Sequence, residues 1–214
     1  MKNKPLIIGA ILSLIALVVF IFLAIGITSV DGGLDFDNKI LSFVHKNINP
    51  AVKNLMIIIS FIGSAKFYFI IAPFLIWYLI KRKHIIELWS LVVAILGSVL
   101  LNNILKASFG RIRPLEFFLV EQSGFSFPSG HSMNTLTFYG MAVYLYLRNK
   151  KLSLKKVLIW VSAVIFILLM GFSRIYLGVH WPSDIIAGYS AGFIWLYICV
   201  LGVEYIHKSK SKSY

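Results

Sequence analysis

Cysteine and acidic side chains are both scarce in this chain of 214 residues. The one cysteine, Cys199, lies inside an apolar run, so the sequence excludes an internal disulfide and a cysteine-based metal site. A single cysteine in such a run is usually inert packing. Eight Asp and Glu residues stand against 21 Lys and Arg residues, which leaves few carboxylates that could bind a catalytic metal ion.

Apolar residues dominate what is present. They make up 59% of the chain, and the mean hydropathy of +0.86 is too high for an ordinary soluble domain. The length suits a single membrane domain, residues 1–214. A net charge of +13 would suggest nucleic-acid binding in a soluble protein, but this chain has no compact basic domain. We therefore expect a multi-pass cell-membrane protein in the lipid bilayer, with no nucleic-acid partner and no obligate protein partner.

Six apolar segments predict an all-α protein with six transmembrane helices, because each is close to the roughly 20 residues that span the hydrocarbon layer. The predicted helices are 6–28, 57–80, 87–107, 131–147, 157–172 and 185–203. The segment 131–147 is only weakly apolar, and its polar side chains should face the protein interior or water. The first segment is longer than the about 7–15 apolar residues of a signal peptide, so we expect a retained helix, with a signal anchor as the alternative.

A short interfacial helix is predicted between the first two spans, within 29–53. Asp31-Gly32-Gly33 marks a turn, and apolar side chains then recur every four residues from Phe36 to Ile48. Such an amphipathic helix is expected to lie at the membrane interface. Its role is open, and a plain connector is the simplest interpretation.

The basic residues predict the orientation. If the N-terminus is cytoplasmic, most Lys and Arg residues fall in cytoplasmic segments, as the positive-inside rule requires, and both termini lie inside the cell. Some basic residues on or near the outer side resist this bias: Lys106, Arg111, Arg113 and Arg174. Charges placed against a topological preference need a reason, and function is a good one.

Polar residues gather in three clusters in the outer half of the chain. The clusters are Lys106 with Arg113-Pro114, then Pro128-Ser129-Gly130-His131, then Ser173-Arg174 with His180 and Asp184. The predicted order of helices places the first two clusters around the loop after the third helix and the last around the loop after the fifth helix. All three clusters are therefore expected on one side of the membrane.

The cations of these clusters predict a phosphate site. Lys106, Arg113 and Arg174 face few matching acids, and an arginine fork matches phosphate oxygens in bidentate fashion, while lysine adds a point charge. Ser129 can cap a helix, and Gly130 allows close backbone approach to an anion bound by the free N–H groups at the helix start. Alone, this turn would be an ordinary helix cap. Together with the cations, it indicates phosphate binding.

The histidines predict the chemistry. Asp184 follows His180 by four residues, and an aspartate that accepts one imidazole N–H holds the other nitrogen toward the substrate, which makes His180 a candidate nucleophile. His131 is the candidate general acid for the leaving oxygen. A lone histidine at an interface is usually structural, but the whole set on one face favours catalysis. Metal catalysis would need more ligands than Asp184 and two histidines among cations, so we expect no metal and no other cofactor.

The three clusters resemble the signature of the type 2 phosphatidic acid phosphatase superfamily, also called lipid phosphate phosphatases. The motifs KxxxxxxRP, PSGH and SRxxxxxHxxxD match at every position between Lys106 and Asp184. The chain's size and short loops are similar to the bacterial phosphatidylglycerophosphatase B branch. The resemblance implies a metal-independent phosphatase. The charge bias and the order of the helices predict that its active site faces the extracytoplasmic side.

The resemblance also implies a role for each site residue. His180 attacks phosphorus and forms a phosphohistidine, Asp184 orients His180, and His131 protonates the leaving group and later activates water. The groups that bind the phosphoryl oxygens are Lys106, Arg113, Ser129, Gly130 and Arg174.

Some polar residues lie outside the signature. Arg111 is expected to steer substrate at most, so its loss should be mild. Asn102, Asn103 and Asn134 lie near the same depth, where they could line a head-group pocket or join helices by hydrogen bonds, and we favour the second role.

The expected function is hydrolysis of a lipid phosphate monoester or diphosphate. Candidate substrates are phosphatidylglycerol phosphate, undecaprenyl diphosphate, phosphatidic acid and diacylglycerol diphosphate, among which the sequence does not choose. The alternative is a non-enzymatic lipid-phosphate binder or transporter, which would share the cationic pocket without needing His180 and Asp184. A vanadate-dependent haloperoxidase has a similar anion pocket, but those enzymes are soluble, and the apolar helices argue against that reading.

Overall fold

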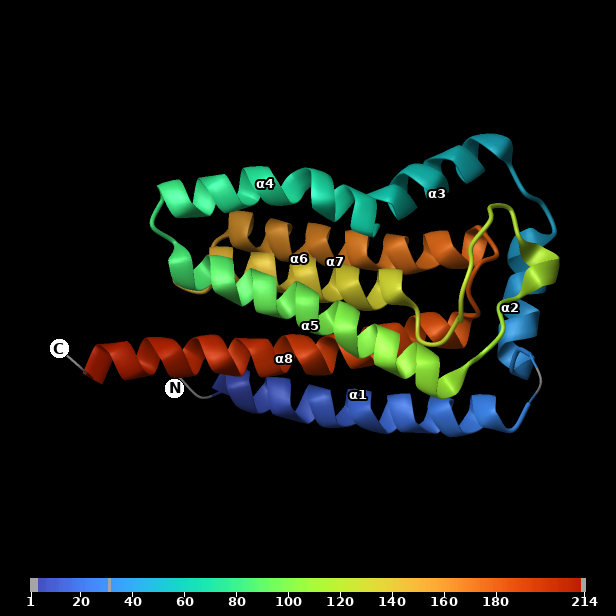
Figure 1. Ribbon diagram of the computed structural model, residues 1–214, viewed down its shortest axis with the longest axis horizontal. Helices are drawn as coiled ribbons and strands as arrows, with labels where there is room; N and C mark the ends of the chain where they lie inside the picture. The colour runs from blue at the N-terminus through green and yellow to red at the C-terminus, as the bar shows by residue number, and fades with distance from the viewer. Residues whose placement is uncertain (1–3, 31, 213–214) are drawn as a thin grey trace.

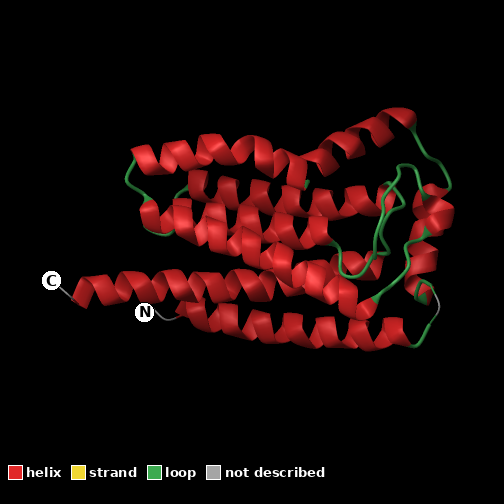
Figure 2. Ribbon diagram, viewed as in Figure 1, coloured by secondary structure: helices red, strands yellow, loops and turns green. Residues whose placement is uncertain are grey.

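All regular structure is helical in the part of the chain that the computed structural model describes, residues 4–30 and 32–212 (Figure 2). The α-helices are α1 (Lys4–Thr28), α2 (Asp35–His45), α3 (Pro50–Ile62), α4 (Ala65–Lys81), α5 (Ile85–Phe109), α6 (Gly130–Leu147), α7 (Leu154–Tyr176) and α8 (Pro182–Lys212), and a short 3-10 helix, η1, covers Leu115–Phe117. The all-α prediction is confirmed. Asp31 of the predicted turn and the outermost residues of both predicted cytoplasmic ends lie outside the described residues.

The long helices run lengthwise beside one another, so their connections gather at two ends of the molecule (Figure 1). Helix α2 and the loops that follow α5 and α7 lie at one end. The start of α1 and the end of α8 lie toward the other end. The three polar clusters therefore share one end of the bundle, as the predicted order of helices requires.

The six-span prediction is confirmed only in part. Among the described residues, four helices, α1, α5, α7 and α8, are long and apolar enough to cross a membrane. The segment 57–80 was expected as one helix, but it is divided between α3 and α4, which are bent by 49° and together would make a fifth span. The break has a local cause, because Ser64 caps α4 by accepting the Phe67 N–H at 3.3 Å.

Helix α6 contains the remaining predicted span, 131–147, but it is not among the helices that meet this length and hydropathy criterion. Its polar side chains are used inside the bundle, where it packs against α5, α7 and α8. Ser98 of α5 donates to Asn134 Oδ1 at 2.7 Å, and Asn102 of α5 donates to the Pro128 carbonyl at 3.2 Å. These two asparagines join α5 to α6 and its preceding loop, which agrees with the favoured prediction.

Glycines of α8 let α6 approach closely. A Cβ atom at Gly188 would lie 2.6 Å from the Ser129 carbonyl oxygen, and one at Gly192 would lie 2.9 Å from the Met133 carbonyl oxygen. Any larger residue at these positions would separate the two helices. The close approach brings the first turn of α6 next to the first turn of α8.

Candidate active site

The site forms where the loop 110–129 meets the turn 177–181. Gly110 ends α5 in the left-handed conformation, with φ of 61°, which glycine adopts without strain. Gly178 has φ of 71°, and a side chain there would collide with the Phe117 carbonyl oxygen. The Leu119 N–H donates to the Leu177 carbonyl at 3.1 Å. The two segments are therefore held together by their own backbones.

The starts of α6 and α8 also touch directly. The Ser129 N–H donates to the Asp184 carbonyl oxygen at 2.9 Å. Ser129 Oγ accepts the Ser132 N–H at 3.4 Å and so caps α6, as the sequence predicts. A Cβ atom at Gly130 would lie 2.8 Å from Asn102 Oδ1, so this glycine allows close contact with α5. The second and third polar clusters thus form one surface.

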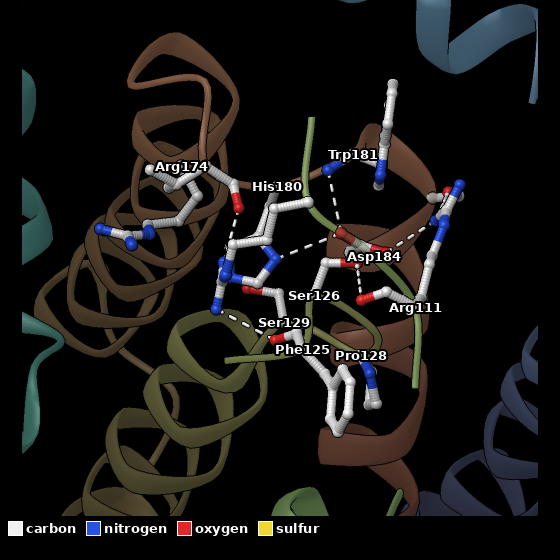
Figure 3. Close-up of polar contacts among 12 residues, drawn as sticks. Arg111, Phe125, Ser126, Pro128, Ser129, Arg174, His180, Trp181 and Asp184 are labelled. Carbon is white, nitrogen blue, oxygen red and sulfur yellow. Dashed lines mark hydrogen bonds and ion pairs between the residues drawn. The ribbon is translucent and has the colours of Figure 1, made fainter. Parts of the chain in front are cut away.

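His180 and Asp184 form a buried pair. His180 is 2% exposed and Asp184 is 0% exposed. His180 Nδ1 lies 3.2 Å from Asp184 Oδ2 (Figure 3). Its Nε2 lies 3.2 Å from Arg113 Nη1. A carboxylate only accepts hydrogen bonds and a guanidinium only donates them. The imidazole must therefore carry its proton on Nδ1 and keep an electron pair on Nε2.

The environment of His180 keeps its imidazole neutral. Burial lowers the pKa of His180 well below the ordinary value of 6.5, and the positive charges of Arg113, Arg174 and Lys106 act in the same direction. At neutral pH the Nε2 electron pair is therefore not protonated. That is the state a nucleophile requires.

Arg113 is enclosed by carbonyl oxygens of the loop and the turn. Its Nε donates to Gly124 O at 2.8 Å, Nη2 donates to Ser123 O and Phe125 O, and Nη1 donates to Val179 O at 2.6 Å. Burial lowers the pKa of Arg113 to about 10, against the charge of Asp184, so the guanidinium stays charged at neutral pH.

Lys106 lies beside Arg113. Its ammonium group donates to Phe125 O, which also accepts a hydrogen bond from Arg113. It lies 3.4 Å from Ser126 O as well. The first polar cluster therefore converges on one short stretch of the loop, directly beside His180 Nε2.

Arg174 is 3% exposed and is held by two residues that the sequence analysis missed. Its guanidinium donates to Ser60 Oγ of α3 and to Gln122 Oε1 of the loop, the latter at 2.9 Å. Its Nε has no hydrogen-bond partner among the described residues. Arg174 therefore keeps donor capacity for an anion. Its partners lie 114 and 52 positions away in sequence, so no local pattern identifies them.

His131 stands in the first turn of α6 and is half-buried. Arg174, Arg113 and Lys106 bring positive charge to its surroundings. All eight sequence-predicted site residues are thus brought together at one end of the bundle, through α5, α6, α7, α8 and the loops between them.

The position of Arg111 differs from the expectation drawn from the sequence. Arg111 was expected as an outer cation for substrate steering, but it is 7% exposed and bound to two carboxylates. Its Nη1 lies 2.7 Å from Asp184 Oδ1, and its Nη2 lies 2.9 Å from Asp37 Oδ2. The site therefore contains a second carboxylate, that of Asp37, besides Asp184. Asp37 belongs to α2, so that helix is more than a connector.

Known proteins are similar to this chain in sequence. The PAP2 superfamily model matches residues 87–208. Phosphatidylglycerophosphatase B of Bacillus subtilis is 41% identical over 106 residues, which are 49% of this chain and 52% of that protein, so the match spans about half of the relative's length. Undecaprenyl-diphosphatase of Sulfolobus acidocaldarius is 28% identical over 186 residues, covering 83% of this chain and 84% of that protein.

A solved structure extends the likeness to the fold. The crystal structure of a transmembrane PAP2 type phosphatidylglycerolphosphate phosphatase from Bacillus subtilis superimposes with a TM-score of 0.80 at 28% identity. The superposition covers 91% of this chain and 96% of that chain. The likeness therefore includes the helices that precede the region matched by the family model.

Proposed function

The chain belongs to the PAP2 superfamily, and from that premise we propose that it is a lipid phosphate phosphatase that works through a phosphohistidine at His180. One observation carries the proposal. His180 is a buried, neutral imidazole whose proton is held on Nδ1 by Asp184, while the Nε2 electron pair faces Arg113. A histidine with only a structural role does not need an unprotonated nitrogen directed at a cluster of cations.

Phosphate binding is the first step. A phosphoryl group enters between Arg113 and His180 and replaces the hydrogen bond that now joins them. Arg113, Lys106 and the free donor capacity of Arg174 bind its oxygens. The N–H groups at the start of α6, next to Ser129 and Gly130, add partial positive charge.

The first chemical step forms the phosphohistidine. The Nε2 electron pair of His180 attacks phosphorus, the bond from phosphorus to the lipid oxygen breaks, and the leaving oxygen takes a proton from His131. The bound dianion brings the negative charge that stabilises a protonated His131 among the cations. Asp184 stabilises the positive charge that develops on the His180 ring.

The second step restores the enzyme. Water gives a proton to His131 and attacks phosphorus, the bond from phosphorus to Nε2 breaks, and its electron pair returns to His180. Inorganic phosphate leaves. Both steps depend on positioning and charge stabilisation, as phosphoryl transfer generally does.

The proposal includes no metal ion. The donor set at the site supports this, because two histidines and Asp184 stand among three cations, which repel a divalent ion, and Asp184 is already engaged by Arg111 and His180. Activity is therefore expected to persist in EDTA.

The proposal also includes the membrane arrangement. We count six spans, with α3 and α4 as one broken span and α6 as an interior span, both termini in the cytoplasm and the site at the extracytoplasmic face. The excess of basic residues in the segments at the opposite end supports this orientation. A lipid head group can then reach the site while its chains stay in the bilayer.

The substrate is proposed as a class. Two of the relatives are a phosphatidylglycerophosphatase and an undecaprenyl-diphosphatase, which supports a lipid with a terminal phosphate or diphosphate as the substrate. Phosphatidic acid belongs to the same chemical class. The three cations suit either group.

A substrate panel with EDTA present tests the proposal. Purified protein in detergent should release phosphate, and His180→Ala should lower turnover by at least about 10³-fold, because it removes the nucleophile. Lys66→Ala, which changes an exposed cation of α4, is the matched control. Binding of lipid phosphate without turnover would favour the binder or transporter. Unimpaired turnover in His180→Ala would end the proposed mechanism.

A further inference from the structure

The carboxylate of Asp184 has two ends with different partners. Oδ2 accepts the Trp181 N–H at 2.9 Å and faces His180 Nδ1 at 3.2 Å. Oδ1 accepts from Arg111 Nη1 at 2.7 Å. His180 and Arg111 lie on opposite sides of this carboxylate (Figure 3). Its rotation, and with it the direction of His180 Nε2, therefore depends on Arg111.

Arg111 is itself held in place on every side. Its Nη1 also donates to Ser183 Oγ at 2.7 Å, its Nη2 donates to Asp37 Oδ2 at 2.9 Å and to the Gly32 carbonyl at 3.0 Å, and its Nε donates to the same carbonyl at 3.3 Å. All five guanidinium N–H groups thus have acceptors within the protein. None is left for a phosphate.

Asp37 completes the cluster from α2. Its Oδ1 accepts the Ser183 N–H at 2.7 Å, and its Oδ2 accepts the Ser183 hydroxyl at 2.6 Å, so it caps the first turn of α8. The Leu34 N–H donates to it at 3.0 Å. Asp37 is 0% exposed, and a buried carboxylate is costly unless it is paired.

Arg111 and Arg113 differ in the charge of the groups that accept their hydrogen bonds. The acceptors around Arg113 are neutral: the His180 imidazole and carbonyl oxygens, several of which lie in exposed parts of the loop. A phosphate can replace them. The acceptors around Arg111 include two buried carboxylates that carry full charge. A phosphate would have to displace those charges to reach it.

We propose that Arg111 and Asp37 are positioning residues for the reaction: they set the orientation of the Asp184 carboxylate and, through it, that of His180, without touching the substrate. Helix α2 is thereby part of the apparatus that aligns the nucleophile. The inference rests on the proposed function, because it requires that His180 and Asp184 act in turnover.

The proposal predicts a particular kinetic signature. Loss of the contact at Oδ1 lets the carboxylate turn, and a small misalignment of a nucleophile costs up to about 10²-fold in rate. Arg111→Gln and Asp37→Asn should each lower kcat by about 10- to 100-fold. KM and the inhibition constant of inorganic phosphate should stay within about threefold of wild type, because the phosphate contacts remain.

The experiment measures kcat, KM and inhibition by inorganic phosphate for monodisperse protein in detergent. Asp35→Asn is the matched control, because it removes an exposed carboxylate from the same turn of α2. Arg111→Lys keeps one charged donor and should restore part of the loss seen in Arg111→Gln. In an Asp184→Asn background, Arg111→Gln should lower kcat by less than about threefold further, since residues that act as a unit are not additive.

The possible outcomes distinguish a positioning role for Arg111 from phosphate binding and from a purely structural role. A raised phosphate inhibition constant with unchanged kcat in Arg111→Gln would make Arg111 a phosphate ligand and overturn the proposal. If Arg111→Gln and Asp37→Asn do not fold, Ser183→Ala, which removes a single hydroxyl, becomes the test. Wild-type kcat in Ser183→Ala and Arg111→Lys would then assign the cluster to stability alone. Wild-type kcat in Asp184→Asn would instead be a failure of the proposed function.

Discussion

Replacing Asp184 with asparagine tests the mechanism closely, because the change keeps the side chain's shape and converts one oxygen to an amide nitrogen. In the native protein both oxygens act as acceptors, Oδ1 for Arg111 at 2.7 Å and Oδ2 for Trp181 N–H at 2.9 Å and His180 at 3.2 Å. Asparagine has a single acceptor oxygen. One side of the site must then face an NH2 group.

Either orientation of the asparagine damages catalysis. If its oxygen faces Arg111, the NH2 group donates to His180 Nδ1, so the imidazole proton moves to Nε2 and the attacking nitrogen loses its free electron pair. If its oxygen faces His180, the NH2 group opposes a buried N–H of Arg111, and the negative charge that stabilises the developing imidazolium is gone. A wrong tautomer costs about 10⁴ in kcat in the aspartate–histidine pair of serine proteases.

We therefore expect kcat to fall by about 10³- to 10⁴-fold, which corresponds to about 4–5.5 kcal/mol in the activation free energy. KM should change by less than about threefold, because Asp184 does not contact the phosphoryl group in the proposed complex. The assay is phosphate release in detergent with EDTA, corrected for the folded fraction by size-exclusion chromatography. A folded Asp184→Asn protein with kcat within about tenfold of wild type would refute the assignment of the Nδ1 proton.

Two further predictions concern pH and topology. As pH falls through 6.5, kcat/KM should not decline, and it should decline only well below that pH, because the depressed pKa of His180 keeps Nε2 unprotonated in the free enzyme. A decline centred at or above 6.5 would contradict this. In that same interval the unfolded chain binds a proton at His180 that the native chain does not. The contribution of His180 to the unfolding free energy should therefore fall by up to about 1.4 kcal/mol for each unit that the pH falls below 6.5. For topology, a membrane-impermeant maleimide should label Ser123→Cys on intact cells and Lys151→Cys only after permeabilisation. Both positions are exposed and lie at opposite ends of the bundle. The native Cys199 is buried and should not react. The reverse pattern would place the site in the cytoplasm.

The helical framework was predictable because it depends on local pattern. Apolar runs of spanning length identified the long helices, and Ser129 identified the start of α6 through its capping chemistry. The prediction was wrong in detail between 57 and 80, where the chain breaks into α3 and α4. Both sides of the break are apolar, so hydropathy does not locate it. The break is identified only by the Ser64 cap and by the close packing of Gly63 against Met170.

The catalytic candidates were predictable for a similar reason. The spacing of His180 and Asp184 is within one helical turn, and helix order alone brings Lys106, His131 and Arg174 to the same end. Their partners were not predictable. Gln122 and Ser60 reach Arg174 from separate elements, and nothing in their local sequence distinguishes them from ordinary polar residues.

By itself, the sequence determined the class of the protein, the end of the bundle that carries the polar clusters and the candidates for the reacting groups. These depend on residue type, on spacing and on the number of helices that separate the clusters along the chain. Only the tertiary structure decided which cations stand beside His180 and which are paired with carboxylates in the interior. Arg111 and Arg113 are two positions apart and chemically identical, yet one is neutralised by Asp37, 74 positions away, and the other lies against His180. That difference arises from contacts between distant elements, which no local pattern encodes.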